Sequence, residues 1–230
     1  MASNPEKDQE KELAARASLR FVGAGDIVGL GSGSTAAFAV SLLGEQVQKG
    51  LKIIGVPTSV HTEQLAARYR IPLATLEQFH DLAVTIDGAD EVDPSLNLIK
   101  GGGGALLREK VVASASRQLI IVADSSKQVA RLGRFPLPVE VIPFAEALVA
   151  GRIAKLGATV TVRRASDGGP FVTDEGHHIL DCQFGEIPDP PSVARALSDM
   201  PGVVEHGLFI GMASVALFGT RDRVIVLWRR

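Results

Sequence analysis

The segment AVTIDGADEVD, residues 83–93, and the segment KGGGGALLREK, residues 100–110, together decide how this chain folds. The short apolar run that ends at Asp87 has the length and the β-branched content of a buried strand. The run from Ala105 to Ser116, after the glycines, has the composition of a helix. Strand, loop and helix in this order form one βα unit of a parallel sheet. The loop between the strand and the helix contains several acids, Lys100 and the four glycines.

The same alternation of short apolar strands with helices extends on both sides of this unit. It predicts an α/β fold with a doubly wound, mostly parallel, Rossmann-like sheet. Sheets of this type bind ligands at the carboxyl ends of their strands, where the polar loops of this chain fall. The further strands are expected at residues 27–30, 52–57 and 119–124, and the further helices at residues 11–22, 36–48 and 62–69.

The pattern changes after Pro136 and Pro138. The order becomes βαββαβ, which predicts a second, smaller ferredoxin-like α+β domain. We therefore expect a Rossmann-like catalytic domain made of residues 1–132 and 209–230, and a small domain over residues 133–208. The strands of the small domain are expected near residues 139–142, 159–163, 178–182 and 203–208, and its helices at 145–156 and 192–199.

The bulk composition is that of an ordinary globular protein. The chain has 230 residues, of which 46% are hydrophobic, and its net charge of −2 gives no general reason to expect nucleic acid or an anionic membrane as a partner. Cys182 is the only cysteine, so no disulfide can form within the chain and a reducing compartment is the simpler expectation. No apolar run approaches the roughly 18–20 residues of a membrane helix. We expect a cytoplasmic protein.

Residues 29–35, GLGSGST, lie between an expected strand and an expected helix. A dinucleotide fingerprint would need a third glycine where Ser34 stands, and an acid at the end of the next strand, which instead closes with residues 56–59, VPTS. A phosphate cradle would use backbone N–H groups and the hydroxyls of Ser32, Ser34 and Thr35 at the helix start. A third interpretation is a tight turn in which Ser34 or Thr35 only caps the helix. We favour the cradle and expect no cofactor.

Asp87 ends an expected strand and Asp90 follows it, and Gly88 permits a turn that could aim both carboxylates into one cleft. An Asp-rich turn that caps the next segment is the structural alternative. These acids, with Glu91 and Asp93, could also hold a metal. Because a nearby lysine supplies a fixed cation and no histidine joins the cluster, we favour a site without metal.

Lys100 precedes four glycines, which lose much backbone entropy when they become ordered. Such a run exposes N–H groups that can face an anionic oxygen, with the lysine beside them. Glu109 lies about one turn into the next helix. Glu109 is either a surface residue of the helix or, because it lies only one turn from the glycine loop, the best-placed candidate for a general base. Lys127, after the strand that ends at Asp124, either binds phosphate or is a solvated loop lysine.

Taken together, these segments resemble the A-type ribose-5-phosphate isomerases over nearly the whole chain. The resemblance implies interconversion of ribose 5-phosphate and ribulose 5-phosphate in the non-oxidative pentose phosphate pathway, without metal or cofactor, by a homodimer or larger assembly. The main alternative is a non-catalytic sugar-phosphate sensor, which would give no role to Glu109. The matching blocks are residues 31–35, 57–59, 87–91, 100–110, 124–127, 202–205 and 207–209.

The resemblance also implies roles for individual residues. Glu109 would move a proton between C1 and C2. Asp87 and Asp90 would bind sugar hydroxyls and assist ring opening or proton transfer between oxygens. Lys100 and the amides of residues 101–103 would stabilise the enediolate. The implied substrate-binding residues are Ser32, Gly33, Ser34, Thr35, Asp87, Gly88, Ala89, Asp90, Lys100, Gly101, Gly102, Gly103 and Lys127.

Two positions depart from the pattern of the family. Ser32 stands where members usually have Thr, which keeps the hydroxyl. Many members carry a phosphate-binding lysine in the first helix, where this chain aligns Glu12, with Lys11 one residue before it. Lys11 or Arg16 could replace that lysine, and the sequence alone leaves this contact open.

Overall fold

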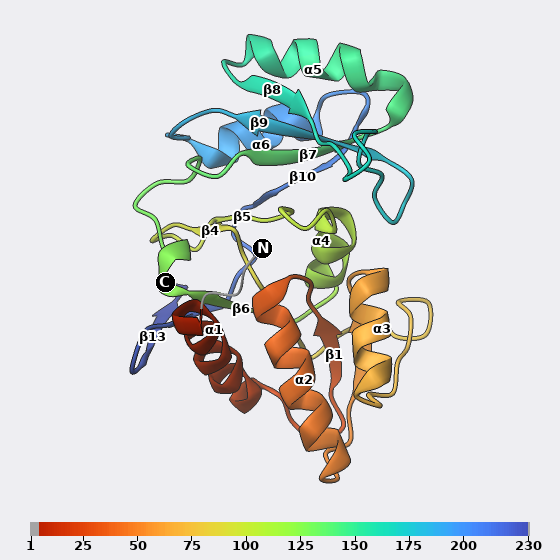
Figure 1. The fold of residues 1–230 in the computed structure, drawn as a ribbon, viewed down its shortest axis with the longest axis vertical. Coiled ribbons are helices and arrows are strands. Elements are labelled where there is room, and N and C mark those ends of the chain that lie inside the picture. The colour runs from red at the N-terminus through yellow and green to blue at the C-terminus, as the bar shows by residue number, and fades with distance from the viewer. Residues whose placement is uncertain (1–4, 230) are drawn as a thin grey trace.

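The computed structural model describes residues 5–229, and its main body is a six-stranded sheet in the order β13-β12-β6-β3-β1-β2 (Figure 1). All neighbouring strands in this sheet are parallel except β12 and β13, which form an antiparallel edge. The mixed α/β fold with a mostly parallel sheet is confirmed. The strands are β1 (Ile27–Leu30), β2 (Ile54–Pro57), β3 (Val84–Asp87), β6 (Leu119–Asp124), β12 (Val215–Gly219) and β13 (Val224–Trp228).

Helices cover both faces of this sheet, as a doubly wound fold requires. Because side chains alternate along a strand, Ile120 and Val122 of β6 pack with the apolar residues of α1, α2 and α3 on one face. Ile121 and Ala123 pack on the other face, where α4 contributes Ala113. The helices are α1 (Pro5–Ser18), α2 (Ser34–Gln48), α3 (Val60–Arg68) and α4 (Leu106–Ser114), and a 3-10 turn, η1 (Leu19–Phe21), follows α1.

Helix α1 begins earlier than expected, at Pro5 rather than near Lys11. Proline is well suited to the first helical position, since its missing N–H has no partner there. Its apolar pattern starts late because its buried residues, Ala14, Ala15 and Ser18, all lie in its second half. The first half is polar and still helical, and it reaches toward the candidate site described below.

The smaller domain is a four-stranded antiparallel sheet in the order β10-β7-β9-β8, with two helices on one side (Figure 1). The chain order βαββαβ and this strand order are those of a ferredoxin-like domain. Its core includes Val139, Val149, Leu180 and Leu197. The elements are β7 (Leu137–Val141), η3 (Pro143–Ala145), α5 (Glu146–Lys155), β8 (Thr159–Val162), β9 (His178–Gln183), α6 (Pro190–Ser198) and β10 (Val203–His206).

A third, short sheet lies between the two larger ones and was not expected. It has the order β11-β5-β4, formed by β4 (Glu91–Val92), β5 (Leu98–Ile99) and β11 (Leu208–Phe209). The single strand expected over residues 203–208 was wrong, because the chain changes sheets at Gly207. The Gly207 N–H donates to Pro138, and its carbonyl accepts from the Lys100 N–H. This junction fixes Lys100 directly after β5. Within residues 5–229, no helix is long and apolar enough to span a bilayer.

Candidate active site

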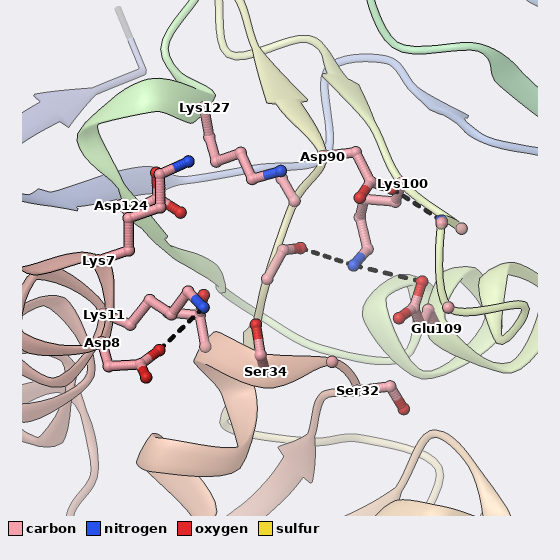
Figure 2. Close-up of a pocket in the computed structure, with 17 residues that line it drawn as sticks. Lys7, Asp8, Lys11, Ser32, Ser34, Asp90, Lys100, Glu109, Asp124 and Lys127 are labelled. Atoms are coloured by element: carbon pink, nitrogen blue, oxygen red, sulfur yellow. Dashed lines mark hydrogen bonds and ion pairs between the residues drawn. The ribbon is translucent and has the colours of Figure 1, made fainter. Parts of the chain in front are cut away.

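The candidate site lies at the carboxyl ends of β1 and β3, where the chain topology reverses. Strand β2 pairs with one side of β1 and β3 pairs with the other, and ligands bind at such switch points. A cavity of about 560 Å³ opens there (Figure 2). It is lined by Lys7, Asp8, Lys11, Ser32, Gly33, Ser34, Thr35, Gly88, Ala89, Asp90, Lys100, Gly101, Gly102, Gly103, Glu109, Asp124 and Lys127.

The structure therefore brings together nearly all of the residues that the sequence singled out. Asp87 is the exception, because its side chain is fully buried beneath the cavity. Its Oδ1 accepts hydrogen bonds from the N–H groups of Gly88 and Ser32, at 2.7 and 3.0 Å. Its Oδ2 lies 2.9 Å from Lys100 Nζ. Asp87 is therefore separated from the cavity and contacts Lys100, which lines it.

Lys100 stands between two carboxylates in a nearly water-free position. Its Nζ lies 3.3 Å from Glu109 Oε2 (Figure 2) and donates to the Gly88 carbonyl at 2.6 Å. Glu109 Oε2 and Asp87 Oδ2 have no hydrogen-bond partner among the described residues, so each contact with Lys100 is an ion pair. Within residues 5–229, no three His, Cys, Asp or Glu side chains group as a metal site would require.

The burial of these three groups changes their acidity. Burial, reinforced by the charge of Asp87, raises the pKa of Glu109 from 4.5 to about 8, although Lys100 opposes the shift. Burial also raises the pKa of Asp87, against Lys100 and its two N–H donors. Burial alone would lower the pKa of Lys100, but the charges of Asp87 and Glu109 outweigh it and raise the pKa. Lys100 is therefore a permanent cation, and Glu109 can exchange a proton near neutral pH.

The four glycines form a tight loop along one wall of the cavity. Gly101 and Gly104 adopt φ angles of 103° and 83°, which side chains rarely tolerate. The Gly102 N–H donates to Asp90 Oδ2 at 2.8 Å. We expected the amides of residues 101–103 to face an anionic oxygen, but that of Gly102 is occupied by Asp90. The Gly103 N–H has no acceptor among the described residues, and Gly103 lines the cavity.

Ser32 and the start of α2 form the opposite wall. The Ser32 hydroxyl bonds with Thr58, Ser59 and Thr62 at 2.8–3.0 Å, and its N–H donates to Asp87. Its side chain therefore points away from the lysines (Figure 2), although Ser32 lines the cavity. Gly33, with φ 90°, caps α2. The N–H groups of the first helical turn have no carbonyl one turn earlier to bond, and they remain available to an anion.

Helix α1 contributes two cations to the cavity: Lys7, which the sequence did not single out, and Lys11, which the sequence left open. Lys7 and Lys11, one helical turn apart, both line the cavity, and Lys11 Nζ lies 3.2 Å from Asp8 Oδ1 (Figure 2). Arg16 instead pairs with Glu12 at the surface, so of the two residues that the sequence left open only Lys11 lines the cavity. The spacing of four residues between Lys7 and Lys11 puts both on one face of a helix, and this could have indicated the pair. It was missed because the helix was expected to start only near Lys11, which left Lys7 outside it. Lys127, from η2 (Ser125–Lys127), completes the set of lysines.

The site combines a buried carboxylate of raised pKa, a buried ammonium group, and cations near a helix N-terminus. On an α/β fold, these features define a site for proton transfer on a small anionic substrate. The chain belongs to the ribose 5-phosphate isomerase A (phosphoriboisomerase A) family, whose model matches residues 54–223. It is 54% identical to ribose-5-phosphate isomerase A of Bradyrhizobium diazoefficiens, covering 97% of each chain. It is also 54% identical to that of Nitrobacter hamburgensis, covering 97% of this chain and 99% of the relative.

Solved structures agree with this assignment. A D-ribose-5-phosphate isomerase in complex with phospho-erythronic acid superposes with a TM-score of 0.95 at 39% identity, covering 97% of this chain and 99% of the other. Ribose 5-phosphate isomerase A from Methanocaldococcus jannaschii superposes with a TM-score of 0.91 at 38% identity, covering 95% and 97%. The fold comparison extends over both the parallel-sheet body and the antiparallel domain.

Proposed function

We propose that the protein interconverts D-ribose 5-phosphate and D-ribulose 5-phosphate through an enediolate intermediate. Membership of the family supports this activity. The observation that carries it is the buried pair of Glu109 and Lys100, 3.3 Å apart, in a cavity whose other end holds Lys7, Lys11 and the N-terminus of α2. One end of the cavity is suited to chemistry and the other to holding phosphate.

The chemistry requires removal of a weakly acidic C–H proton next to a carbonyl. Glu109 is the proposed base: it takes the proton from C2 of the aldose and returns it to C1. A pKa near 8 makes its carboxylate more basic than an ordinary glutamate, while enough remains ionised to react. We assign the stabilisation of the negative enediolate oxygen to Lys100 and the Gly103 N–H, because both residues line the cavity.

We divide the two aspartates between different tasks. Asp90 lines the cavity with its carboxylate held by Gly102, so we assign it the sugar hydroxyls and help with ring opening. Asp87 has no exposed surface, and we assign it the task of keeping Lys100 charged and in place. Both roles are narrower than those that the sequence resemblance implied.

We assign the phosphate to the N–H groups of residues 33–35, with Lys7, Lys11 and Lys127 as its counter-charges. A phosphate at a helix N-terminus is stabilised both by N–H donors and by the helix dipole. Holding this remote group orients the sugar against Glu109, so binding energy far from the reaction contributes to the rate.

The test is an isomerase assay on ribose 5-phosphate in the presence of EDTA, followed by the same reaction in D2O. We expect full activity with the chelator and solvent deuterium at the transferred position. Glu109→Gln should lose at least about a hundredfold in turnover and still bind substrate. Loss of wild-type activity on chelation, restored by metal, would contradict the metal-free route. Failure to turn over ribose 5-phosphate, with tight binding retained, would favour the sensor.

We further propose that the protein serves the non-oxidative pentose phosphate pathway in the cytoplasm and works as a homodimer. Two apolar side chains on the small domain support an assembly, because Phe144 is 98% exposed and Leu148 is 56% exposed. Multi-angle light scattering should give twice the chain mass of 24.2 kDa. A single mass equal to one chain at micromolar concentration would contradict the dimer.

A further inference from the structure

Arg163, a residue of the small domain, donates hydrogen bonds to the backbone of the glycine loop. Arg163 follows β8 and reaches across to the main domain, where its Nη1 donates to the carbonyls of Gly101 and Gly102 at 2.9 and 3.1 Å. Arg163 is not among the residues that line the cavity. Sequence reasoning assigned no function to it.

Arg163 is itself held in place by its own domain. Its Nε and Nη2 donate to the two carboxylate oxygens of Asp181 on β9, at 3.0 and 2.5 Å. Its guanidinium group also lies 5.9 Å from the ring centre of Phe171. A bidentate carboxylate pair orients the guanidinium plane, so the remaining nitrogen is aimed at the loop before any substrate binds.

Holding two carbonyls fixes the direction of two N–H groups. In a trans peptide the C=O and the N–H point to opposite sides of the chain. The peptide from Gly101 to Gly102 turns its carbonyl to Arg163 and its N–H to Asp90. The next peptide turns its carbonyl to Arg163, which directs the Gly103 N–H to the opposite side, where Gly103 borders the cavity.

Phe171 supports the same loop at its other end. A Cβ atom on Gly104 would stand 2.5 Å from the Phe171 ring, so ring and backbone are in direct contact. The small domain thus contacts three of the four glycines, through side chains that lie about 60 residues further along the chain.

We propose that Arg163 is a positioning residue for the enediolate site: it orients the Gly102 and Gly103 peptides so that Asp90 is held and one N–H faces the reacting oxygen. This inference rests on the proposed isomerase function. It gives the small domain a part in catalysis that is separate from the stability of the fold.

The test compares Arg163→Met with Arg164→Met, its exposed neighbour, which removes the same charge. Methionine retains much of the apolar stem, so the packing on Phe171 is largely kept. We expect kcat of Arg163→Met to fall about tenfold to a hundredfold, less than the loss typical of a direct oxyanion donor. KM should change less than about threefold, because the phosphate contacts are untouched. Arg164→Met should match the wild type.

A binding measurement separates positioning from general damage. Phospho-erythronic acid carries a carboxylate that can stand in for the enediolate oxygens, whereas inorganic phosphate tests only the other end of the cavity. Calorimetry should show about tenfold weaker binding of phospho-erythronic acid to Arg163→Met and unchanged binding of phosphate. Equal weakening of both ligands, or unchanged kcat, would overturn the proposal.

A second variant covers the case in which the unpaired Asp181 destabilises the protein. Arg163→Met combined with Asp181→Asn removes the stranded charge and should restore stability while kcat stays low. Recovery of kcat in the double variant would show that only the fold had been damaged. If the wild type itself is inactive on ribose 5-phosphate, the proposed function fails. If the wild type is active and the Arg163 variants match it, the positioning role alone fails.

Discussion

Replacing Glu109 by glutamine should stabilise the substrate-free protein, and the gain should grow as the pH rises. The folded protein holds the Glu109 proton up to about pH 8, whereas the unfolded chain releases it near pH 4.5. Between these values the folded state binds more protons, so the free energy of unfolding falls as the pH increases. Glutamine has nearly the same shape and carries no charge at any pH, so it avoids this loss.

The magnitude follows from the same shift. Each pKa unit corresponds to about 1.4 kcal/mol, so moving a pKa from 4.5 to about 8 costs the folded state roughly 5 kcal/mol once the group is fully ionised. Water in the cavity and relaxation of Lys100 reduce this cost. We expect Glu109→Gln to add about 2–4 kcal/mol at about pH 9, and less than about 1 kcal/mol at about pH 5, where the carboxyl is mostly neutral.

The assay is urea unfolding followed by circular dichroism, for wild type and variant, at several pH values and without phosphate. Glu63→Gln is the matched control, because Glu63 is an exposed residue of the neighbouring helix α3. Because its side chain is exposed, this substitution should change the free energy of unfolding by less than about 0.5 kcal/mol. A constant difference between Glu109→Gln and the wild type from pH 5 to 9, or a less stable variant at pH 9, would refute the reasoning.

Three further predictions concern the geometry and charge of the site. Gly31→Ala places a Cβ atom 2.3 Å from Asp87 Oδ1, so activity should fall at least about tenfold in the isomerase assay. The control Gly151→Ala, on α5, places its Cβ atom in open space and should leave the activity unchanged. Lys11→Met should raise both KM and the inhibition constant of inorganic phosphate about tenfold, because the bound phosphate loses a counter-charge. The control Arg16→Met removes only a surface ion pair and should alter neither constant. The wild-type kcat/KM should rise with pH toward a plateau with a midpoint near 8, since the proposed base must be ionised; a flat profile from pH 6 to 9 would contradict that role.

Residues at the carboxyl end of a strand could be located from the sequence. Asp87 ends β3 and Ser32 follows β1, and the carboxyl ends of parallel strands share one edge of the sheet. Lys100 and Glu109 flank a glycine loop in the same chain segment, so their nearness also follows from local order. The positions of these residues follow from the order of strands and helices, which the sequence pattern predicts.

Contacts made by side-chain direction or by the packing of two domains could not be found in this way. The Ser32 hydroxyl turns into a cluster of hydroxyls because Thr58, Ser59 and Thr62 lie behind it, which no local pattern indicates. Arg163 reaches Gly101 only because the small domain packs over the loop. Such contacts depend on the orientation of whole elements, which sequence periodicity does not encode.

The close packing of α1 on β12 links one end of the cavity to a strand far along the chain. Gly219 lies so near the backbone of Glu10 that a Cβ atom there would stand 1.7 Å from the Glu10 carbonyl oxygen. Helix α1 therefore rests in part on a strand that lies far from it in the sequence, besides its contacts with α2 and β6. Lys11 is carried by this helix, whereas Glu109 and Lys100 lie in one chain segment and are held by each other. We therefore expect a change that loosens β12 to weaken the proposed phosphate contact of Lys11 more than the pair of Glu109 and Lys100.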